Sequence, residues 1–156
     1  MSADFAPIPR VAILLEARSW IGTPYRHQAS AKGAGCDCLG LIRGVWRALI
    51  GPEPLPTPAY RADWFGPGDT RLIEAAHAFL VPTPTETAST GDVLILAPRR
   101  DEPARHCAIV SQPGWIIHAY WGRTVAETPL GAFGARVAGA FGFPGVEPPP
   151  SKEDKD

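Results

Sequence analysis

The sequence predicts an α+β fold in one domain, with helices first and an antiparallel sheet after them. Apolar residues recur with helical spacing in the first half of the chain, and after Gly91 their period changes from 3.6 towards 2. Helices followed by strands are typical of α+β domains. The length of 156 residues fits a single domain, and the sequence contains no internal repeat.

Three segments of the first half are predicted to be helices. The first covers about residues 9–21, and the second covers about residues 38–50 with a strong apolar stripe. Each is followed directly by glycine, which commonly ends helices. The third begins with Asp69 as its N-cap and ends at Pro82, because proline cannot continue a helix.

The second half is predicted to form short strands bounded by glycine and proline. Alternating apolar residues place five of them at residues 92–97, 107–112, 115–120, 123–128 and 136–143. The domain is therefore expected to span residues 1–145. Residues 146–156 are rich in proline and charge, and they are expected to form a flexible tail.

The composition excludes several classes of protein. The 15 basic and 16 acidic side chains leave a net charge of -1, so no nucleic-acid partner is expected. The longest apolar run near the start, residues 11–15, is far shorter than the ~20 residues of a membrane span, so no membrane insertion is expected. No secretory signal is visible, so the chain is expected to be made in the cytoplasm. To act outside the cell, the protein would have to leave by another route.

Residues 33–43 hold the first candidate for catalysis. Glycines lead into Asp37, and Cys38 then opens the second predicted helix. The free N–H groups and the positive dipole end of a helix N-terminus favour a thiolate, and the same N–H groups can bind an oxyanion. Asp37 is a candidate cap for this helix. The alternative is that Cys38 is a small core residue, because free cysteines are commonly buried.

A thiolate nucleophile needs a base, and His106 and His118 are the candidates. Each lies in a predicted strand, and residues 112–114 form the turn between the two strands. A hairpin that turns near residue 112 places the two histidines opposite each other within about one residue. One imidazole could then take the thiol proton while the other orients it. The alternative is that each histidine is an ordinary surface or core residue.

Cys36, Cys38 and Cys107 raise the possibility of a zinc site. Three cysteines cannot all pair within the chain, and without a secretory signal they are expected to be thiols. Strand alternation places Cys107 on the face opposite His106, and the spacings lack the paired pattern of structural zinc. Neither a metal nor another cofactor is therefore expected.

Five motifs together carry a resemblance to a known family. In chain order they occupy residues 21–26 (Ile-Gly-Thr-Pro-Tyr-Arg), 37–42 (Asp-Cys-Leu-Gly-Leu-Ile), 91–96, 106–110 and 117–119. In this order they resemble the motifs of the NlpC/P60 cysteine peptidases, over nearly the whole chain from about residue 10 to residue 143. Each motif alone is weak, whereas five in the correct order are specific.

The resemblance implies a papain-like fold and an activity. The implied reaction is hydrolysis of an amide bond in the stem peptide of peptidoglycan, usually between γ-D-glutamyl and diaminopimelate or lysine. By position, Cys38 matches the nucleophile, His106 the general base and acid, and His118 the residue that orients it. Tyr25 matches a tyrosine whose hydroxyl lies near the oxyanion site, and Asp37 matches an acidic residue with a structural role.

The form of the motif around the cysteine is similar to the phage-type branch of the family. That branch carries Asp-Cys-Xaa-Gly-Leu, as at residues 37–41, and Leu39 stands where many other members have serine. The similarity implies incorporation into the tail of a virion or gene transfer agent, contact with a tail hub or baseplate protein, and action in the periplasm or cell wall of the recipient. Two alternatives stay open: a structural tail component with incidental activity, and an amidase or acyltransferase on the same scaffold.

Overall fold

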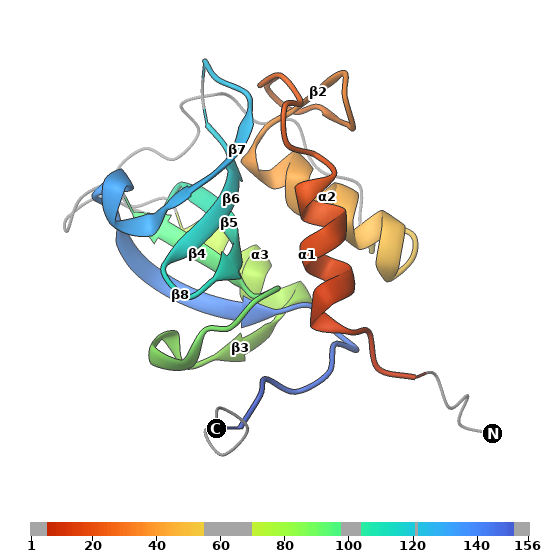
Figure 1. Ribbon diagram of the computed structural model, residues 1–156, viewed down its shortest axis with the longest axis vertical. Helices are drawn as coiled ribbons and strands as arrows, with labels where there is room; N and C mark the ends of the chain where they lie inside the picture. The colour runs from red at the N-terminus through yellow and green to blue at the C-terminus, as the bar shows by residue number, and fades with distance from the viewer. Residues whose placement is uncertain (1–5, 55–69, 98–103, 121, 152–156) are drawn as a thin grey trace.

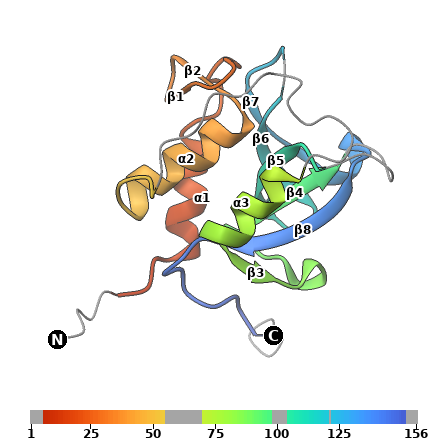
Figure 2. The ribbon, with the colours of Figure 1, turned by 180° about the vertical axis from the view of Figure 1, so that it is seen from behind.

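The computed structural model describes residues 6–54, 70–97, 104–120 and 122–151, and it confirms the α+β class. A six-stranded antiparallel sheet is accompanied by three α-helices (Figure 1). Helices α1 and α2 lie side by side at one side of the sheet, and α3 packs beside β3 and β8 (Figure 2). None of the helices in the described residues is long and apolar enough to cross a membrane.

The three helices are α1 (Arg10–Arg18), α2 (Cys38–Leu49) and α3 (Arg71–Phe79). The prediction for α2 is confirmed almost to the residue. Helix α1 ends earlier than predicted, because hydrogen bonds from Trp20 and Ile21 to carbonyls three residues back tighten the chain into turns. Thr70 is the N-cap of α3, and the predicted cap Asp69 lies outside the described residues.

The sheet has the strand order β3-β8-β4-β5-β6-β7, and every neighbouring pair is antiparallel. Its strands are β3 (Val81–Thr83), β4 (Val93–Ala97), β5 (His106–Gln112), β6 (Trp115–Ala119), β7 (Val125–Pro129) and β8 (Arg136–Gly142). The last five were predicted. The sequence prediction missed the edge strand β3, whose three residues were assigned partly to the preceding helix, as well as the 3₁₀ turns η1 (Thr85–Thr87) and η2 (Leu130–Phe133).

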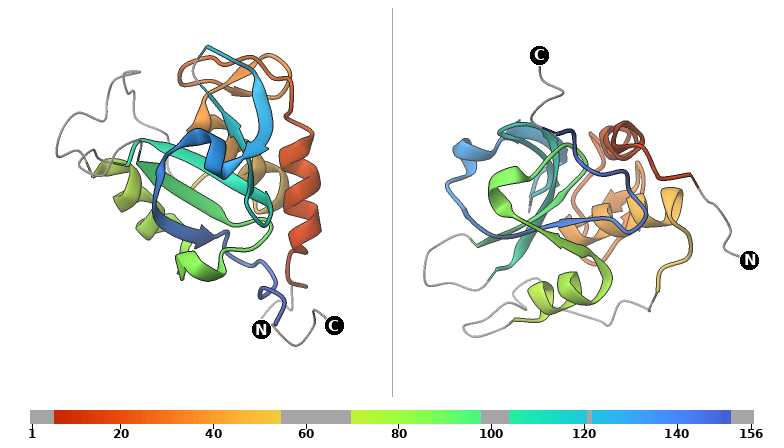
Figure 3. Two further views of the ribbon diagram at one scale, coloured as in Figure 1. Left: turned by 60° about the vertical axis from the view of Figure 1, so that its left-hand side comes forward. Right: turned by 90° about the horizontal axis from the view of Figure 1, so that it is seen from below.

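Buried apolar side chains form two clusters. The larger one joins the helices to the sheet and includes Ile13, Leu41 and Ile109. The smaller one includes Leu96 and Ile116, and Leu130 of η2 packs against it. Figure 3 shows that the sheet is strongly curved. The smaller cluster shows that side chains are also buried on the second face of the sheet. Both faces of β5 and β6 are therefore buried, which fixes the register of these strands.

The two ends of the described chain are joined. Ile8 forms a β-bridge with Val146, and the backbone N–H of Arg10 donates to Glu147 at 2.9 Å. The Arg10 guanidinium also pairs with the buried Asp92 at 2.8 Å. The packing at this end thus includes Val146 and Glu147, the first two residues of the predicted tail. Residues 152–156 of the predicted tail lie outside the described residues.

Candidate active site

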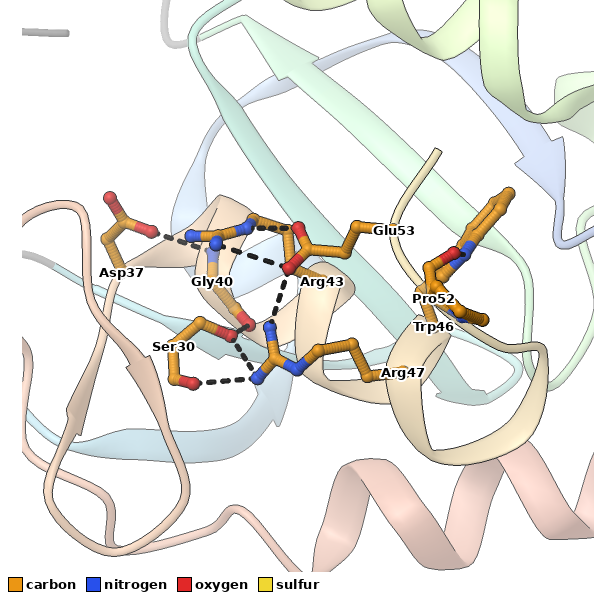
Figure 4. Close-up of polar contacts among 8 residues, drawn as sticks. All are labelled: Ser30, Asp37, Gly40, Arg43, Trp46, Arg47, Pro52 and Glu53. Atoms are coloured by element: carbon orange, nitrogen blue, oxygen red, sulfur yellow. Dashed lines mark hydrogen bonds and ion pairs between the residues drawn. The ribbon is translucent and has the colours of Figure 1, made fainter. Parts of the chain in front are cut away.

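Cys38 is the first residue of α2, and Asp37 fixes this end of the helix. The Asp37 side chain is only 2% exposed. One carboxylate oxygen accepts from the backbone N–H of Gly40 at 2.7 Å, as the N-cap prediction requires (Figure 4). The other accepts from the N–H of Gln28 at 2.8 Å. The carboxylate therefore joins the helix to the loop that precedes it.

This loop approaches the first turn of α2 so closely that only glycine fits at position 40. A Cβ on Gly40 would lie 1.9 Å from the carbonyl oxygen of Ala29. The same carbonyl accepts from the N–H of Asp37 at 3.3 Å. Since a helix leaves its first four N–H groups without intrahelical partners, the bonds made by Asp37 and Gly40 leave those of Cys38 and Leu39 as the donors available to a ligand.

A network of polar side chains holds the same loop from the outside (Figure 4). The Ser30 hydroxyl donates to the carbonyl of Gly40 at 2.6 Å, and Arg47 donates to the carbonyl of Ser30 at 2.7 Å. Glu53 accepts from both Arg43 and Arg47. Exposed ion pairs contribute little stability individually, so we assign this network to positioning of the loop.

His106 and His118 come together across the hairpin of β5 and β6. The Nε2 atom of His106 lies 2.9 Å from Nδ1 of His118. The predicted turn is confirmed, but the predicted register is wrong: Ile109 pairs with Ile117, which places His118 beside Ala108. A bulge lies between Val110 and Gln112, and His106 is two residues away from Ala108, the residue opposite His118. The histidines remain on one face as diagonal neighbours, within reach of long side chains.

His118 is buried and its second ring nitrogen is also bonded. Nε2 lies 3.0 Å from the hydroxyl oxygen of Thr128 on β7. Burial and then the charge of His106 lower the pKa of His118 from 6.5 to about 4. At neutral pH this imidazole is therefore uncharged and carries one N–H.

The environment of Cys38 favours its thiolate. A hydrogen bond from the Cys107 thiol, followed by a hydrogen bond with His106 and the charge of that ring, holds the pKa of Cys38 well below its ordinary value against the effect of burial. The same interaction with Cys38, together with burial, raises the pKa of Cys107 well above the usual range. Cys107 therefore donates and Cys38 accepts, and the anion is assigned to Cys38.

Tyr25 lies close enough to the cysteine for its charge to act on the phenol. Burial and then the negative charges of Cys38 and Asp37 raise the pKa of Tyr25 to about 12. Its backbone forms a bridge with Cys36, which holds the residue beside the start of α2. The phenol therefore stays protonated at neutral pH, and its O–H is a permanent hydrogen-bond donor.

The structure thus brings together Tyr25, Asp37, Cys38, His106 and His118, which the sequence singled out. Within the described residues, no group of three or more histidine, cysteine or acidic side chains could hold a metal ion. Sequence reasoning missed the roles of Cys107 and Thr128. Alternation placed Cys107 opposite His106 and it was set aside, whereas the face that it occupies is the one packed on α2.

The site thus combines a cysteine at the start of a helix with a histidine pair on an antiparallel sheet. The sequence profile of the NlpC/P60 family matches residues 22–133. The chain belongs to the NlpC/P60 family, and it has the fold of the peptidoglycan hydrolases in that family.

Solved structures agree with this assignment. The NlpC/p60 domain of the peptidoglycan hydrolase SagA is 27% identical with a TM-score of 0.62, and the match covers 86% of this chain and 98% of that domain. NlpC2 from Trichomonas vaginalis (18% identity, TM-score 0.63) matches 91% of this chain and 48% of its own length. An NlpC/P60 family protein from Bacillus cereus ATCC 10987 is 20% identical with a TM-score of 0.62. The match covers 88% of this chain and 41% of that protein. Among curated proteins, none matches this chain.

Proposed function

We propose that this protein is a cysteine endopeptidase that cleaves an amide bond in the stem peptide of peptidoglycan. The observation that carries the proposal is the continuous line of contacts from Cys38 through His106 to His118. An activated thiolate, a proton-transfer group and a residue that orients this group are the parts that nucleophilic catalysis requires. The similarity to the NlpC/p60 domain of the peptidoglycan hydrolase SagA supports the choice of substrate.

In the first half of the reaction, the Cys38 thiolate attacks the carbonyl carbon of the scissile amide. The carbonyl oxygen becomes an oxyanion, and the backbone N–H of Cys38, at the start of α2, and the protonated hydroxyl of Tyr25 donate to it. His106 gives its proton to the leaving nitrogen, the C–N bond breaks, and the amine departs. The acyl group remains on Cys38 as a thioester.

In the second half, His106 acts as a base towards water. The water oxygen attacks the thioester carbonyl, His106 takes one proton, and the C–S bond breaks to release the Cys38 thiolate and a carboxylic acid, which loses its proton to the solvent. His118 accepts a hydrogen bond from Nε2–H of the His106 imidazolium and keeps the ring in place. His118 need not become charged, which agrees with its lowered pKa.

Digestion of purified peptidoglycan tests this function. Incubation in H₂¹⁸O followed by mass spectrometry of the soluble fragments should show one ¹⁸O in each new carboxylate, and the fragment masses identify the bond. Cys38→Ala serves as the control and should release nothing. Fragments condensed with an added amine instead of ¹⁸O would identify an acyltransferase, and release of intact stem peptides from glycan would identify an amidase. Absence of any product would overturn the proposal.

We also propose that the enzyme acts from a phage-like tail, docked on a hub or baseplate protein, in the periplasm or cell wall of a recipient cell. The support is the sequence signature at residues 37–41, with Leu39 in place of serine. Mass spectrometry of tail particles purified from producing cells should detect the chain in a fixed ratio to the hub protein. Its absence from such particles would contradict this location.

A further inference from the structure

Three neighbouring strands each place one polar side chain on the same face of the sheet. His118 of β6 lies in the middle, with Nδ1 2.9 Å from His106 of β5 and Nε2 3.0 Å from the Thr128 hydroxyl of β7. His118 pairs with Ala126 in the β6–β7 register, so Thr128 is its diagonal neighbour on that face. The relay that begins at Cys38 therefore continues one residue beyond the pair of histidines.

We propose that Thr128 is a positioning residue that fixes the tautomer of His118. In this arrangement Nε2–H of His118 donates to the Thr128 hydroxyl, so Nδ1 of His118 keeps a free lone pair for the His106 imidazolium. The inference rests on the proposed function, because it assumes the ion pair of Cys38 and His106.

The proton count on the two rings requires this tautomer. An imidazolium carries N–H on both nitrogens, so Nε2 of a protonated His106 is a donor. A neutral His118 carries only one N–H, and an N–H on its Nδ1 would face the N–H of His106 at 2.9 Å. The ion pair is therefore compatible only with His118 protonated at Nε2, and that N–H needs an acceptor.

Thr128 supplies an acceptor that water cannot easily replace. The His118 side chain is 4% exposed, and a buried donor without a partner is costly. The titratable rings that face His118 are those of His106 and Tyr120, with ring centroids 5.1 Å and 6.1 Å away. The Thr128 hydroxyl lies 3.0 Å from Nε2 of His118, within hydrogen-bond distance of that N–H.

The test compares three variants by the reactivity of Cys38 rather than by peptidoglycan cleavage. Thr128→Val removes the hydroxyl and keeps the shape, Thr128→Ser keeps a hydroxyl, and Thr83→Val is the matched control. Thr83 is a half-buried threonine on β3, at the opposite edge of the sheet. The rate of Cys38 alkylation by iodoacetamide is measured from pH 4 to pH 10, with peptide mapping by mass spectrometry to separate the three cysteines.

Thr128→Val is expected to shift the alkylation midpoint upward by about one pH unit, which lowers the thiolate about tenfold at a given pH below the midpoint. Thr128→Ser should restore the profile, and Thr83→Val should leave it unchanged. ¹⁵N NMR of the His118 ring should show Nε2–H in the unsubstituted protein and a mixture of tautomers in Thr128→Val.

A Thr128→Val profile equal to that of the unsubstituted protein, or an equal shift in Thr83→Val, overturns the inference. The results that would overturn the proposed function differ from those that would overturn this inference. An ordinary thiol profile for Cys38 in the unsubstituted protein overturns both proposals, because there is then no ion pair to position. The expected shifts in a protein that does not cleave peptidoglycan support the tautomer assignment and contradict only the substrate.

Discussion

The site has two sides, the N-terminal turn of α2 and the strands β5, β6 and β7. The two sides differ in whether the side chain at their centre is favoured in its charged or its neutral form. At the start of α2, Cys38 accepts a hydrogen bond from the Cys107 thiol of β5, and the pKa of Cys38 is held well below its ordinary value. On the strand side, burial lowers the pKa of His118 to about 4, which keeps this ring neutral. One side stabilises an ion, and the other excludes one.

This difference confines charge to a single pair of groups. Buried ions are costly unless paired and hydrogen-bonded. In the proposed mechanism, with Tyr25 protonated and His118 neutral, the ion pair at the centre of the site is that of Cys38 and His106. The neutral partners supply hydrogen bonds with fixed direction, so proton transfer to or from His106 does not require a second buried group to change its charge.

Removal of the Cys38 thiolate should cause the largest loss of activity. Cys38→Ala is expected to abolish fragment release from peptidoglycan, because no other group can form the thioester. Cys36→Ala is the matched control: Cys36 is also a buried thiol beside the start of α2, but it is not among the groups that lower the pKa of Cys38. Residual cleavage by Cys38→Ala, or equal loss in Cys36→Ala, would show that the nucleophile is wrongly assigned.

The two histidines should contribute unequally. His106→Ala removes the group that moves protons, and the expected loss in kcat/KM is about 10²–10⁴-fold. His118→Asn keeps an oxygen that can accept from Nε2–H of His106, so measurable activity should remain. Steady-state kinetics on a soluble muropeptide separate the two cases. If both variants lose activity equally, His118 does more than orient its neighbour.

The neutrality of His118 can be measured as a dependence of stability on pH. The unfolded chain binds a proton at this residue near pH 6.5, whereas the folded chain binds it only near pH 4. The unfolded state therefore holds more protons between these values, and the free energy of unfolding falls as the pH is lowered through this window, by about 3 kcal/mol.

Urea denaturation at pH 7, 6, 5 and 4 checks this slope. His118→Asn should show a decrease smaller by about 3 kcal/mol, and comparison of the two proteins cancels the carboxylates that titrate in both. Equal slopes in the two proteins would mean that His118 is protonated as easily in the folded state as in the unfolded one.

The cap of α2 should be worth less than the buried imidazole. Asp37→Ala leaves the N–H groups of Gly40 and Gln28 without their acceptor, and we expect a loss of about 2 kcal/mol in the free energy of unfolding. Asp37→Asn keeps one acceptor oxygen and should lose about half as much. Denaturation of both variants at pH 7 measures the difference, and an equal loss would show that the charge, and not the hydrogen bond, stabilises this turn.

The sequence was sufficient wherever a local signal determined the structure. The apolar stripe and the cap of α2 are encoded in consecutive residues, and so is the alternation of β4 to β8. Strand β3 was missed because three residues carry little periodicity and are held by pairing with β8. Helix α1 was predicted too long because its last apolar residues continue the pattern through turns.

The same division applies to the site. Cys38, His106 and His118 could be predicted because a helix start and a hairpin bring them together. The bulge between Val110 and Gln112 could not be predicted, and in the observed register His118 lies opposite Ala108, two residues from His106. Thr128 depends on the register of β6 with β7, and Cys107 on how the sheet packs against α2. Both are long-range features without a local sequence signal.

The smallest expected effect concerns the thiol that assists the nucleophile. Cys107 is 1% exposed and donates to Cys38. Hydrogen bonds to a charged acceptor contribute about 1.5–3 kcal/mol, so Cys107→Ala should raise the pKa of Cys38 by about one unit. Cys107→Ser keeps an O–H donor and should recover part of this shift, while Cys36→Ala should cause none. The alkylation rate of Cys38 as a function of pH measures all three variants. If Cys36→Ala produces the same shift as Cys107→Ala, the helix N-terminus and His106 stabilise the thiolate without a specific donor, and the contrast between the two sides of the site depends on the helix alone.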